Sequence, residues 1–117
     1  MKKLTLTVLT VAASIFASSV SAFDPDDLQK LKDTNECMNC NLTAVNLKDA
    51  NLMDANLEGA DLSGANLKGA FFYDANLKGA DLSGANLKGA DLSYAIMNSV
   101  ILCNTIIPDG SVIYSGC

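Results

Sequence analysis

DLSGANLKGA is the sequence of Asp61–Ala70, and the same ten residues occur again at Asp81–Ala90. Each copy holds two leucines five residues apart, and the residue before each leucine is aspartate or asparagine. The two copies begin twenty residues apart, a distance that equals four of these five-residue units. The chain therefore has a short period of five residues inside a longer period of twenty.

The short period extends far beyond the two copies. Apolar residues occupy every fifth position from Leu42 to Val112, and an alanine stands two positions before them from Ala50 to Ala95. An amphipathic helix needs apolar residues at a spacing of 3.6 and a half-buried strand needs a spacing of 2, so a period of five fits neither. Such a long run is typical of a solenoid repeat, and the twenty-residue period predicts four short sides in each turn.

The unit Ala-(Asp/Asn)-Leu-X-X, as in Ala65–Gly69, resembles the repeat of the pentapeptide-repeat family. This resemblance implies an all-β fold, a right-handed quadrilateral β-helix, whose central leucine and preceding alanine point inward. The last position of the unit would then lie at a corner, where the backbone freedom of glycine is useful. That position holds Gly59, Gly64, Gly69, Gly79, Gly84 and Gly89, and in other units Asp49, Asp54, Asp74 and Tyr94.

The first 22 residues have the pattern of an export signal. Lys2 and Lys3 precede an apolar run, and Val20-Ser21-Ala22 fits the small-residue rule for cleavage, so the mature chain is predicted to begin at Phe23. A retained membrane anchor is the alternative, but Thr and Ser interrupt a run that is short for a span of about twenty residues. Cleavage would remove two of the eight cations and none of the thirteen acids, leaving a net charge of about −7. We therefore predict a periplasmic or secreted protein.

Residues 23–39 are predicted to cap the first turn of the solenoid. Asp24 followed by Pro25 is a helix start signal, and acids at 26 and 27 suit the positive end of a helix dipole. A single short turn of helix would be marginal in water, so Phe23, Leu28 and Leu31 are expected to dock on the open end of the coil. The coil itself is predicted over residues 40–114, and residues 115–117 are predicted to close its far end.

Four cysteines admit three interpretations. A shared zinc site is opposed by the coil, because Cys40 and Cys103 would lie just over three turns apart, or about 15 Å. A redox CxxC pair at Cys37 and Cys40 lacks the βαβ context, and Glu36 opposes a thiolate. An exported chain with an even number of cysteines favours structural disulfides, Cys37 with Cys40 and Cys103 with Cys117.

The twenty-residue turn also assigns outward residues to sides of the coil. One side aligns Lys48, Lys68 and Lys88, and the neighbouring Asn46, Asn66 and Asn86 are expected to form an amide ladder. The next side aligns Met53 and Asp54 with Phe71, Tyr73 and Asp74, then with Asp91, Ser93 and Tyr94, and finally with Ile113 and Tyr114.

Exposed aromatic residues on one side predict a partner-binding surface with Phe71, Tyr73 and Tyr94 as its anchors. The alternative is that these rings only cover neighbouring strands, since cross-strand aromatic pairs stabilise sheets.

Function is least determined by the sequence. Nothing resembles a nucleophile–base pair or a phosphate loop, so we predict no enzyme activity and no cofactor or metal. The chain has no histidine and no basic cluster, so nucleic acid is not an expected partner. A non-enzymatic interaction module of the cell envelope is the first hypothesis. Some pentapeptide-repeat proteins mimic duplex DNA and bind topoisomerases, and the resemblance makes this the alternative, with a CxxC redox protein as a third possibility.

Overall fold

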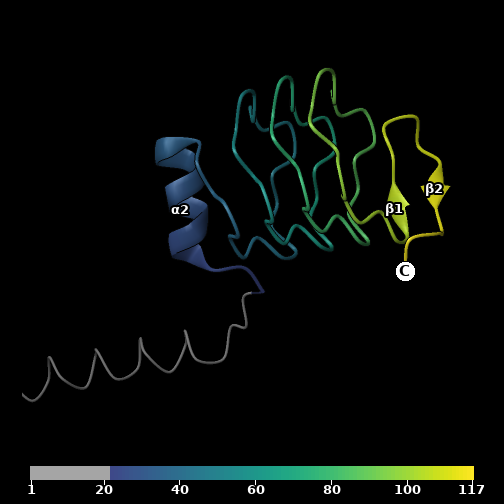
Figure 1. Cartoon of the computed structure of the whole chain (residues 1–117), viewed down its shortest axis with the longest axis horizontal. Helices are drawn as coiled ribbons and strands as arrows, with labels where there is room; N and C mark the ends of the chain where they lie inside the picture. Colours follow the sequence, from purple (N-terminus) through teal and green to yellow (C-terminus); the bar gives the residue numbers. More distant parts are fainter. Residues whose placement is uncertain (1–21) are drawn as a thin grey trace, which may run out of the picture.

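The structure, a computed structural model, describes residues 22–117. Its elements are α2 (Pro25–Thr34), β1 (Thr105–Ile106) and β2 (Val112–Ile113). Helix α2 lies at one end of a stack of coils, and β1 and β2 lie at the other end (Figure 1). Apart from Ala22, the predicted leader falls outside the described residues, and its cleavage stays a prediction.

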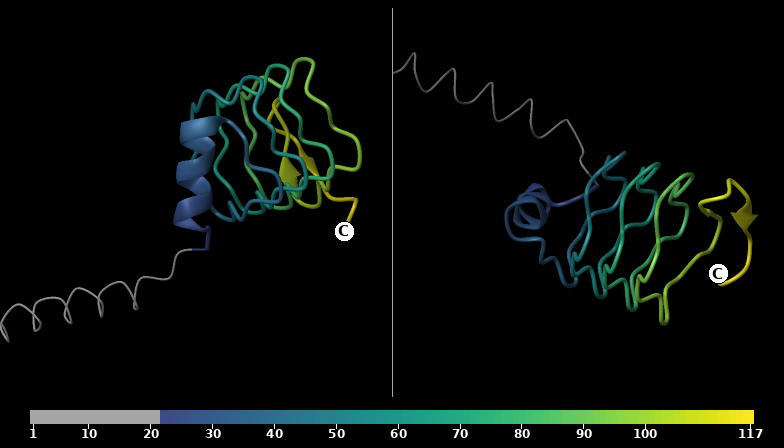
Figure 2. Two further views of the ribbon diagram at one scale, coloured as in Figure 1. Left: turned by 60° about the vertical axis from the view of Figure 1, so that its left-hand side comes forward. Right: turned by 90° about the horizontal axis from the view of Figure 1, so that it is seen from above.

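Between α2 and β2 the chain winds in turns of twenty residues. Parallel bridges join residues twenty apart, from Glu36–Asn56 to Asn86–Ile106, and they recur at five-residue steps. Figure 2 shows the successive turns stacked beside one another. Backbone N–H groups of the inward leucines donate to carbonyl oxygens nineteen residues later, as from Leu62 to Asp81 at 2.8 Å. Each turn therefore has the four sides that the sequence period predicts, joined by single bridges rather than by long strands.

The inward column forms the core. Phe72 and seven leucines of the column have no exposed surface, and most alanines two positions before them are equally buried. The alanines occupy little volume, so each side of the turn has room for one large side chain. Full burial of a leucine is worth about 1.5–3 kcal/mol relative to exposure, so this column is the main source of stability. The seven leucines are Leu42, Leu57, Leu62, Leu67, Leu77, Leu82 and Leu87.

Two local features explain why the repeat prefers Asn or Asp directly before the leucine and Gly two positions after the leucine. The Asn66 side-chain oxygen accepts a hydrogen bond from the Lys68 backbone N–H at 3.2 Å, and ten outward Asn and Asp side chains of the coil make this bond. Such bonds close Asx turns. The next residue adopts a left-handed conformation, with φ between 56° and 74° at the coil corners from residue 39 to residue 104. Glycine takes this conformation with the least strain.

Side-chain bonds between turns lie on a different side from the predicted amide ladder, and they include one amide–amide bond among the described residues. Asn46, Asn66 and Asn86 use their side-chain oxygens in Asx turns. The bonds between turns join Asn56 to Glu36 at 3.2 Å and Asn76 to Asn56 at 3.4 Å. Identical side chains one turn apart are therefore not sufficient for a ladder. The Asx turn does not itself prevent one, because the Asn56 oxygen accepts both from the Glu58 N–H and from the Asn76 side chain.

Helix α2 begins where the sequence predicted. Asp24 is the N-cap and accepts a bond from the Asp26 N–H at 2.8 Å, and Pro25 is the first helical residue. Asn35, with φ at 62°, ends the helix. The helix has ten residues, so the predicted single turn was too short. Acids in the first turn and Lys32 in the last turn both suit the helix dipole.

The helix covers the first turn through both apolar and polar contacts. Leu31 is 3% exposed, and Phe23 and Leu28 pack against the same core. The Asp24 N–H donates to the Asn41 carbonyl oxygen at 3.0 Å, and the Asn41 N–H donates to the Asp27 carboxylate at 2.8 Å. Part of the open edge of the first turn is therefore paired, as the cap hypothesis requires.

The C-terminal end departs from the five-residue count. β1 and β2 pair antiparallel, with Thr105 opposite Ile113 and Ile106 opposite Val112. The count placed Val112 in the inward column above Leu92, and this was wrong, because Val112 lies in the hairpin and is 36% exposed. The physical reason is a shifted turn: Gly110, with φ at 91°, takes the left-handed conformation in place of Asp109.

Candidate functional site

The aromatic face is the side of the coil formed by residues 51–54, 71–74 and 91–94. Phe71 is 48% exposed, Tyr73 is 37% exposed and Tyr94 is 76% exposed. Met53, on the first of the three turns, is 42% exposed. The three predicted anchors therefore all lie on one outer side of the coil, on two adjacent turns.

The structure brings two of the anchors into direct contact. The rings of Tyr73 and Tyr94 lie with centroids 5.3 Å apart and planes at 72°, an edge-to-face arrangement. Phe71 lies in the outward row of bridged residues, between Asn51 on one neighbouring turn and Asp91 on the other. The parallel bridges thus hold the rings on a rigid side of the coil.

Phe71 occupies a position where the fold prefers another residue. Its counterparts on the adjacent turns, Asn51 and Asp91, accept bonds from the N–H groups of Met53 and Ser93 at 3.1 and 2.9 Å. A phenylalanine has no acceptor, so it leaves the Tyr73 N–H without this turn-closing bond. A hydrogen bond of this kind is worth about 0.5–1.5 kcal/mol, so the aromatic ring replaces a stabilising interaction.

Tyr94 also opposes the local preference. It has φ at 60°, in the left-handed region that most equivalent positions fill with glycine or aspartate. This conformation costs a residue with a Cβ atom about 1–2 kcal/mol, and bulky residues adopt it rarely. The sequence analysis placed Tyr94 at the last position of the unit, which six other units fill with glycine, but it did not recognise the strain that this position imposes.

The charges on the aromatic face are all negative. Asp54, Asp74 and Asp91 lie on it, and residues 51–54, 71–74 and 91–94 contain no lysine. The Ser93 side chain and backbone N–H both hydrogen-bond the Asp91 carboxylate and hold its pKa below the usual value, which favours the charged form. The face therefore combines aromatic rings with carboxylates.

Tyr114 and Ile113 do not extend this face. The sequence count placed them beyond Ser93 and Tyr94, but antiparallel pairing puts Ile113 beside Thr105. Tyr114 is 76% exposed in the segment that follows β2. This part of the predicted alignment was wrong for the reason given for Val112: the turn is shifted to Gly110, and the chain forms a hairpin instead of a further coil.

All four cysteines are in disulfides. Cys37 pairs with Cys40, with Cα atoms 5.3 Å apart, and Cys103 pairs with Cys117, with Cα atoms 4.9 Å apart. Cys37 is fully buried and Cys40 is 4% exposed, so the CxxC pair forms part of the core. Reactive thiols are partly exposed, so this environment suits a structural bond. No group of three or more metal-ligating side chains in residues 22–117 is arranged to hold a metal ion.

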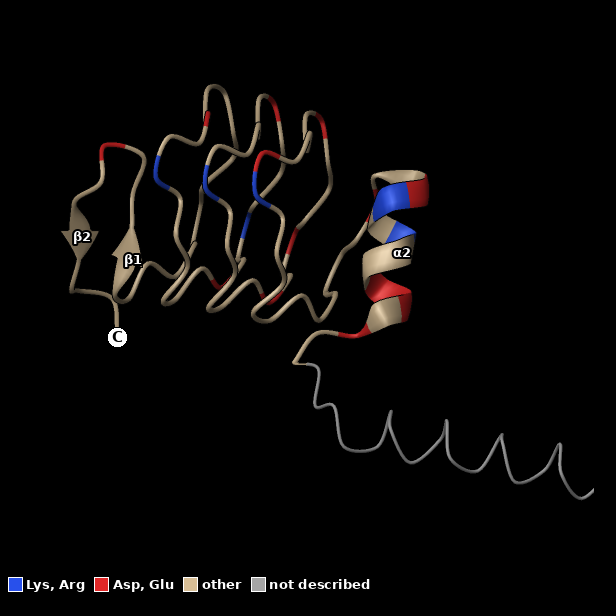
Figure 3. Ribbon diagram, turned by 180° about the vertical axis from the view of Figure 1, so that it is seen from behind, with Lys and Arg blue, Asp and Glu red and all other residues tan. Residues whose placement is uncertain are grey.

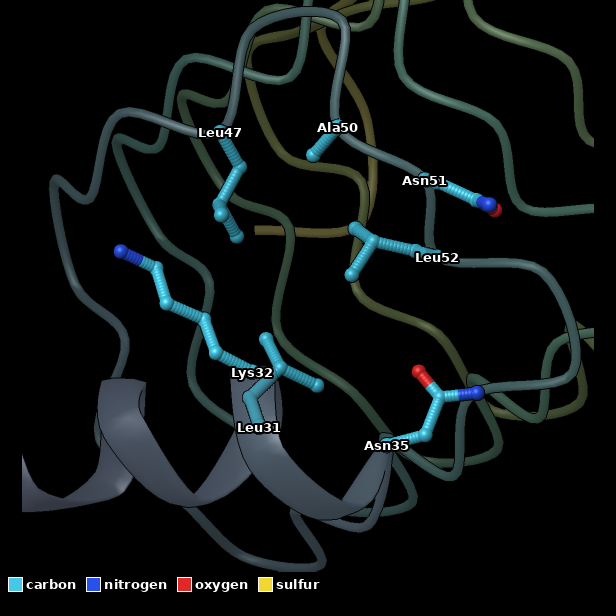
Figure 4. A pocket seen from close by; sticks show the side chains of 7 residues that line it. All are labelled: Leu31, Lys32, Asn35, Leu47, Ala50, Asn51 and Leu52. Carbon is cyan, nitrogen blue, oxygen red and sulfur yellow. The ribbon is translucent and has the colours of Figure 1, made fainter.

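A hollow of about 250 Å³ lies between α2 and the first turn. Leu31, Leu47 and Leu52 point toward it, with Lys32 and Asn51 among the polar residues around it (Figure 4). Sequence analysis did not predict it, since it arises from the way α2 crosses the coil. The three leucines are each at most 7% exposed, which leaves little apolar surface for a ligand.

The lysines of the coil lie mainly on the side that precedes the aromatic face. Lys48, Lys68 and Lys88 follow bridged residues twenty apart, and Figure 3 shows basic segments recurring on one side of successive turns. Most acidic segments lie elsewhere on the same turns, although Asp49 directly follows Lys48 (Figure 3). The surface is thus sorted by side rather than uniformly negative.

Comparisons with known proteins identify the repeat. A sequence model described as pentapeptide repeats (8 copies) matches residues 36–72 and 72–107. No curated protein matches the chain. Within residues 22–117, no helix has both the length and the apolar character needed to cross a membrane.

Three solved structures are similar to parts of the chain. One is HetL, a pentapeptide repeat protein involved in heterocyst differentiation regulation in the cyanobacterium Nostoc sp. strain PCC 7120. It is 34% identical in sequence, with a TM-score of 0.26, and the match covers 61% of this chain and 40% of HetL. A pentapeptide repeat protein of the Arabidopsis thaliana thylakoid lumen is 37% identical with a TM-score of 0.30, over 56% and 49%. A further pentapeptide repeat protein of Nostoc PCC 7120 is 25% identical with a TM-score of 0.29, over 68% and 75%. The match spans less than half the length of the first two proteins.

Proposed function

Because this chain belongs to the pentapeptide-repeat family, whose members are generally non-enzymatic structural or interaction modules, we propose that it is an exported protein-binding module of the cell envelope. The coil has the right-handed quadrilateral form that the family implies. Its aromatic face is the binding surface, with Phe71, Tyr73 and Tyr94 as anchors.

One observation supports this assignment above the others: two of the three anchors occupy positions where the coil favours another residue type. Phe71 replaces an Asx-turn acceptor, and Tyr94 replaces a residue suited to positive φ. Local strain and lost capping concentrate at functional sites, because selection for binding opposes selection for stability there. Rings that merely covered strands would instead be expected at positions where they add stability.

The position of the face on an outer side of the coil, away from the hollow beside α2, suggests a macromolecular partner. Small ligands bind in concave pockets that enclose most of their surface. The hollow beside α2 is lined by none of the three anchors. Tyrosine and phenylalanine are frequent interface anchors, since they give large contact area at low entropic cost.

Export is proposed from the leader pattern and the disulfides. Two disulfides suit an oxidising compartment. We divide the chain into a leader (1–22), an N-terminal cap (23–39), a coil (40–114) and a closing tail (115–117), with the hairpin of β1 and β2 inside the last part of the coil segment. Cell fractionation with N-terminal sequencing should find a processed protein that begins at Phe23 outside the cytoplasm. Recovery of full-length protein in the cytoplasm would overturn this part.

The topoisomerase-binding alternative has the acidic charge in its favour. Lys48, Lys68 and Lys88 interrupt that charge along the coil, and export would separate the protein from such a target. A redox role for Cys37 and Cys40 is less favoured, because both sulfur atoms are bonded within the core.

The binding surface is tested by separating binding from folding. We expect the variant Phe71→Asn, Tyr73→Ser, Tyr94→Gly to fold, since it restores residue types common at these positions. The wild-type protein, purified from the exported fraction, is immobilised and exposed to envelope extract, and bound proteins are quantified by mass spectrometry. Affinity for any partner of the wild type should fall at least tenfold in the variant.

The matched control is Glu58→Ser, Lys78→Ser, which changes the adjoining side without altering the net charge. This control should bind as the wild type does. A folded aromatic-face variant that keeps full affinity would show that the rings are strand cover. Loss of binding in the control alone would move the surface to the adjoining side.

A further inference from the structure

The three rings of the aromatic face are interleaved with carboxylates in a fixed order. Asp91 lies one turn from Phe71 in the same bridged row. Asp74 follows Tyr73 in the chain and precedes Tyr94 by one turn in the corner column. Each aromatic residue therefore has an aspartate next to it, either in the chain or at the equivalent position of the adjacent turn, and Asp54 extends the corner column by another turn.

This arrangement favours one sign of charge in a partner. The flat side of an aromatic ring attracts a cation that lies within about 6 Å of the ring centroid, and arginine is the most frequent protein cation in such contacts. A carboxylate beside the ring adds a charge-assisted hydrogen bond to the same guanidinium. An anionic partner would meet three carboxylates with no lysine among the residues of the face.

We propose that the aromatic face binds a basic, arginine-containing protein segment, with guanidinium groups placed over the rings and paired with Asp54, Asp74 and Asp91. The proposal rests on the proposed function, because it names the chemistry of a partner for that same surface. A polypeptide is favoured over a small quaternary amine, because the face is a side of the coil rather than a cage, and it spans three turns.

The experiment uses a defined probe, an octapeptide of alternating arginine and threonine with blocked ends. Two matched peptides replace arginine by citrulline, which keeps the shape and removes the charge, or by glutamate, which reverses it. Binding is followed by NMR on labelled protein, so that the residues that respond are identified. The arginine peptide should shift the amide signals of residues 51–54, 71–74 and 91–94, while the citrulline peptide should bind at least tenfold more weakly and the glutamate peptide should not bind.

Two variants with equal loss of negative charge distinguish recognition by the aromatic face from general electrostatic attraction of the arginine peptide to an acidic protein. Asp54→Asn, Asp74→Asn removes two carboxylates from the aromatic face, where asparagine tolerates positive φ. Asp61→Asn, Asp81→Asn removes two carboxylates from another side, where asparagine can accept the same bonds from the Ser63 and Ser83 N–H groups. The first variant should lose at least tenfold in affinity for the arginine peptide, and the second less than threefold.

Equal losses in the two variants, or equal binding of the citrulline peptide, would overturn the proposal. A natural partner that requires Phe71 and Tyr94 but tolerates Asp54→Asn, Asp74→Asn would also overturn it, while leaving the proposed function intact. A partner that ignores the rings altogether would instead contradict the proposed function. Arginine-peptide shifts confined to other sides of the coil would overturn the charge assignment independently of any natural partner.

Discussion

At the N-terminal end of the coil, α2 lays ten residues across the first turn, whereas at the C-terminal end the chain folds back in a hairpin of two-residue strands. The first end is closed largely by side chains, beside the backbone bond from Asp24 to Asn41: Asp27 accepts from the Asn41 N–H, and the Asn35 side chain donates to the Met53 carbonyl oxygen at 2.9 Å. The second end is closed by backbone pairing and by the Cys103–Cys117 disulfide.

This difference appears in the burial of the core beneath each end. Leu42 in the first turn has no exposed surface, whereas Leu92, Met97 and Leu102 in the last turn are only partly buried. A solenoid end exposes both an apolar column and unpaired strand edges. Helix α2, with its apolar stripe, covers the inward leucine column at the N-terminal end. The narrow hairpin covers only part of the column at the other end, so the stability of the C-terminal end depends more on the Cys103–Cys117 disulfide.

The largest expected effect is a contrast between core leucines at the two ends. Leu42→Ala should lower the free energy of unfolding by about 2–5 kcal/mol, because a cavity remains beneath α2. Leu102→Ala should cost less than half as much, since its side chain is already partly in contact with water. Urea denaturation of both variants, with Lys68→Ala as an outward control near zero, measures the contrast. Equal losses at Leu42 and Leu102 would show that both ends are equally closed.

The disulfide at the C-terminal end should contribute more to the free energy of unfolding than the disulfide at the N-terminal end. In the chain-entropy description, a closed loop of about fifteen residues contributes roughly 3 kcal/mol, and a ring of four contributes roughly 2 kcal/mol. Cys103→Ser, Cys117→Ser should therefore destabilise the protein by about 3 kcal/mol and speed amide exchange in β1 and β2 more than in the first turn. Hydrogen exchange followed by mass spectrometry measures where protection is lost. Uniform loss along the coil would contradict a local role for this bond.

Relief of the backbone strain at Tyr94 should raise the free energy of unfolding, by less than the preceding substitutions lower it. Tyr94→Gly should stabilise the coil by about 1 kcal/mol, because glycine adopts φ near 60° without the Cβ penalty. Gly79→Ala is the reverse test. A Cβ atom there would meet nothing within 4 Å, and φ is 69°, so the substitution adds only the cost of holding a residue with a Cβ atom in the left-handed conformation. Thermal unfolding of the two variants should shift the midpoint in opposite directions. A destabilised Tyr94→Gly protein would mean that contact with Tyr73 outweighs the strain.

The smallest expected effect is a pH dependence at the hairpin. The Ser111 hydroxyl and N–H donate to the Asp109 carboxylate and hold its pKa below its ordinary value of 3.8. A lowered pKa in the folded state means that the contribution to stability is present above that ordinary value and is lost as the pH falls through the folded-state pKa. NMR titration below pH 4 should show the Ser111 amide signal following Asp109. Asp109→Asn should abolish this titration, and a Ser111 amide that ignored the carboxylate would contradict the bond.

The repeat itself was predictable because it is local. The inward leucines, the Asx-forming residues and the left-handed corners are each specified within five residues, so the sequence predicted the inward column from Leu42 to Leu92 and the outward residues of the lysine and aromatic sides. The cap was predictable for a similar reason, since Asp24 and Pro25 mark a helix start in the sequence itself. The length of α2 was underestimated because its later residues are stabilised by docking on the coil rather than by their own pattern.

What the sequence alone determined is therefore the five-residue unit, the twenty-residue turn and the outward positions of Phe71, Tyr73 and Tyr94. The tertiary structure decided the edge-to-face contact of Tyr73 with Tyr94, the hollow beside α2 and the reversal after Ile107. At that reversal, Ile107–Val112 still has an apolar residue at each expected position, but the Ile107 N–H donates to the Ser111 carbonyl oxygen at 2.9 Å and Gly110 takes the left-handed turn. The physical reason is that the five-residue pattern encodes which residues prefer to be buried, whereas the choice between another turn and a hairpin depends on which backbone partners the folded chain provides.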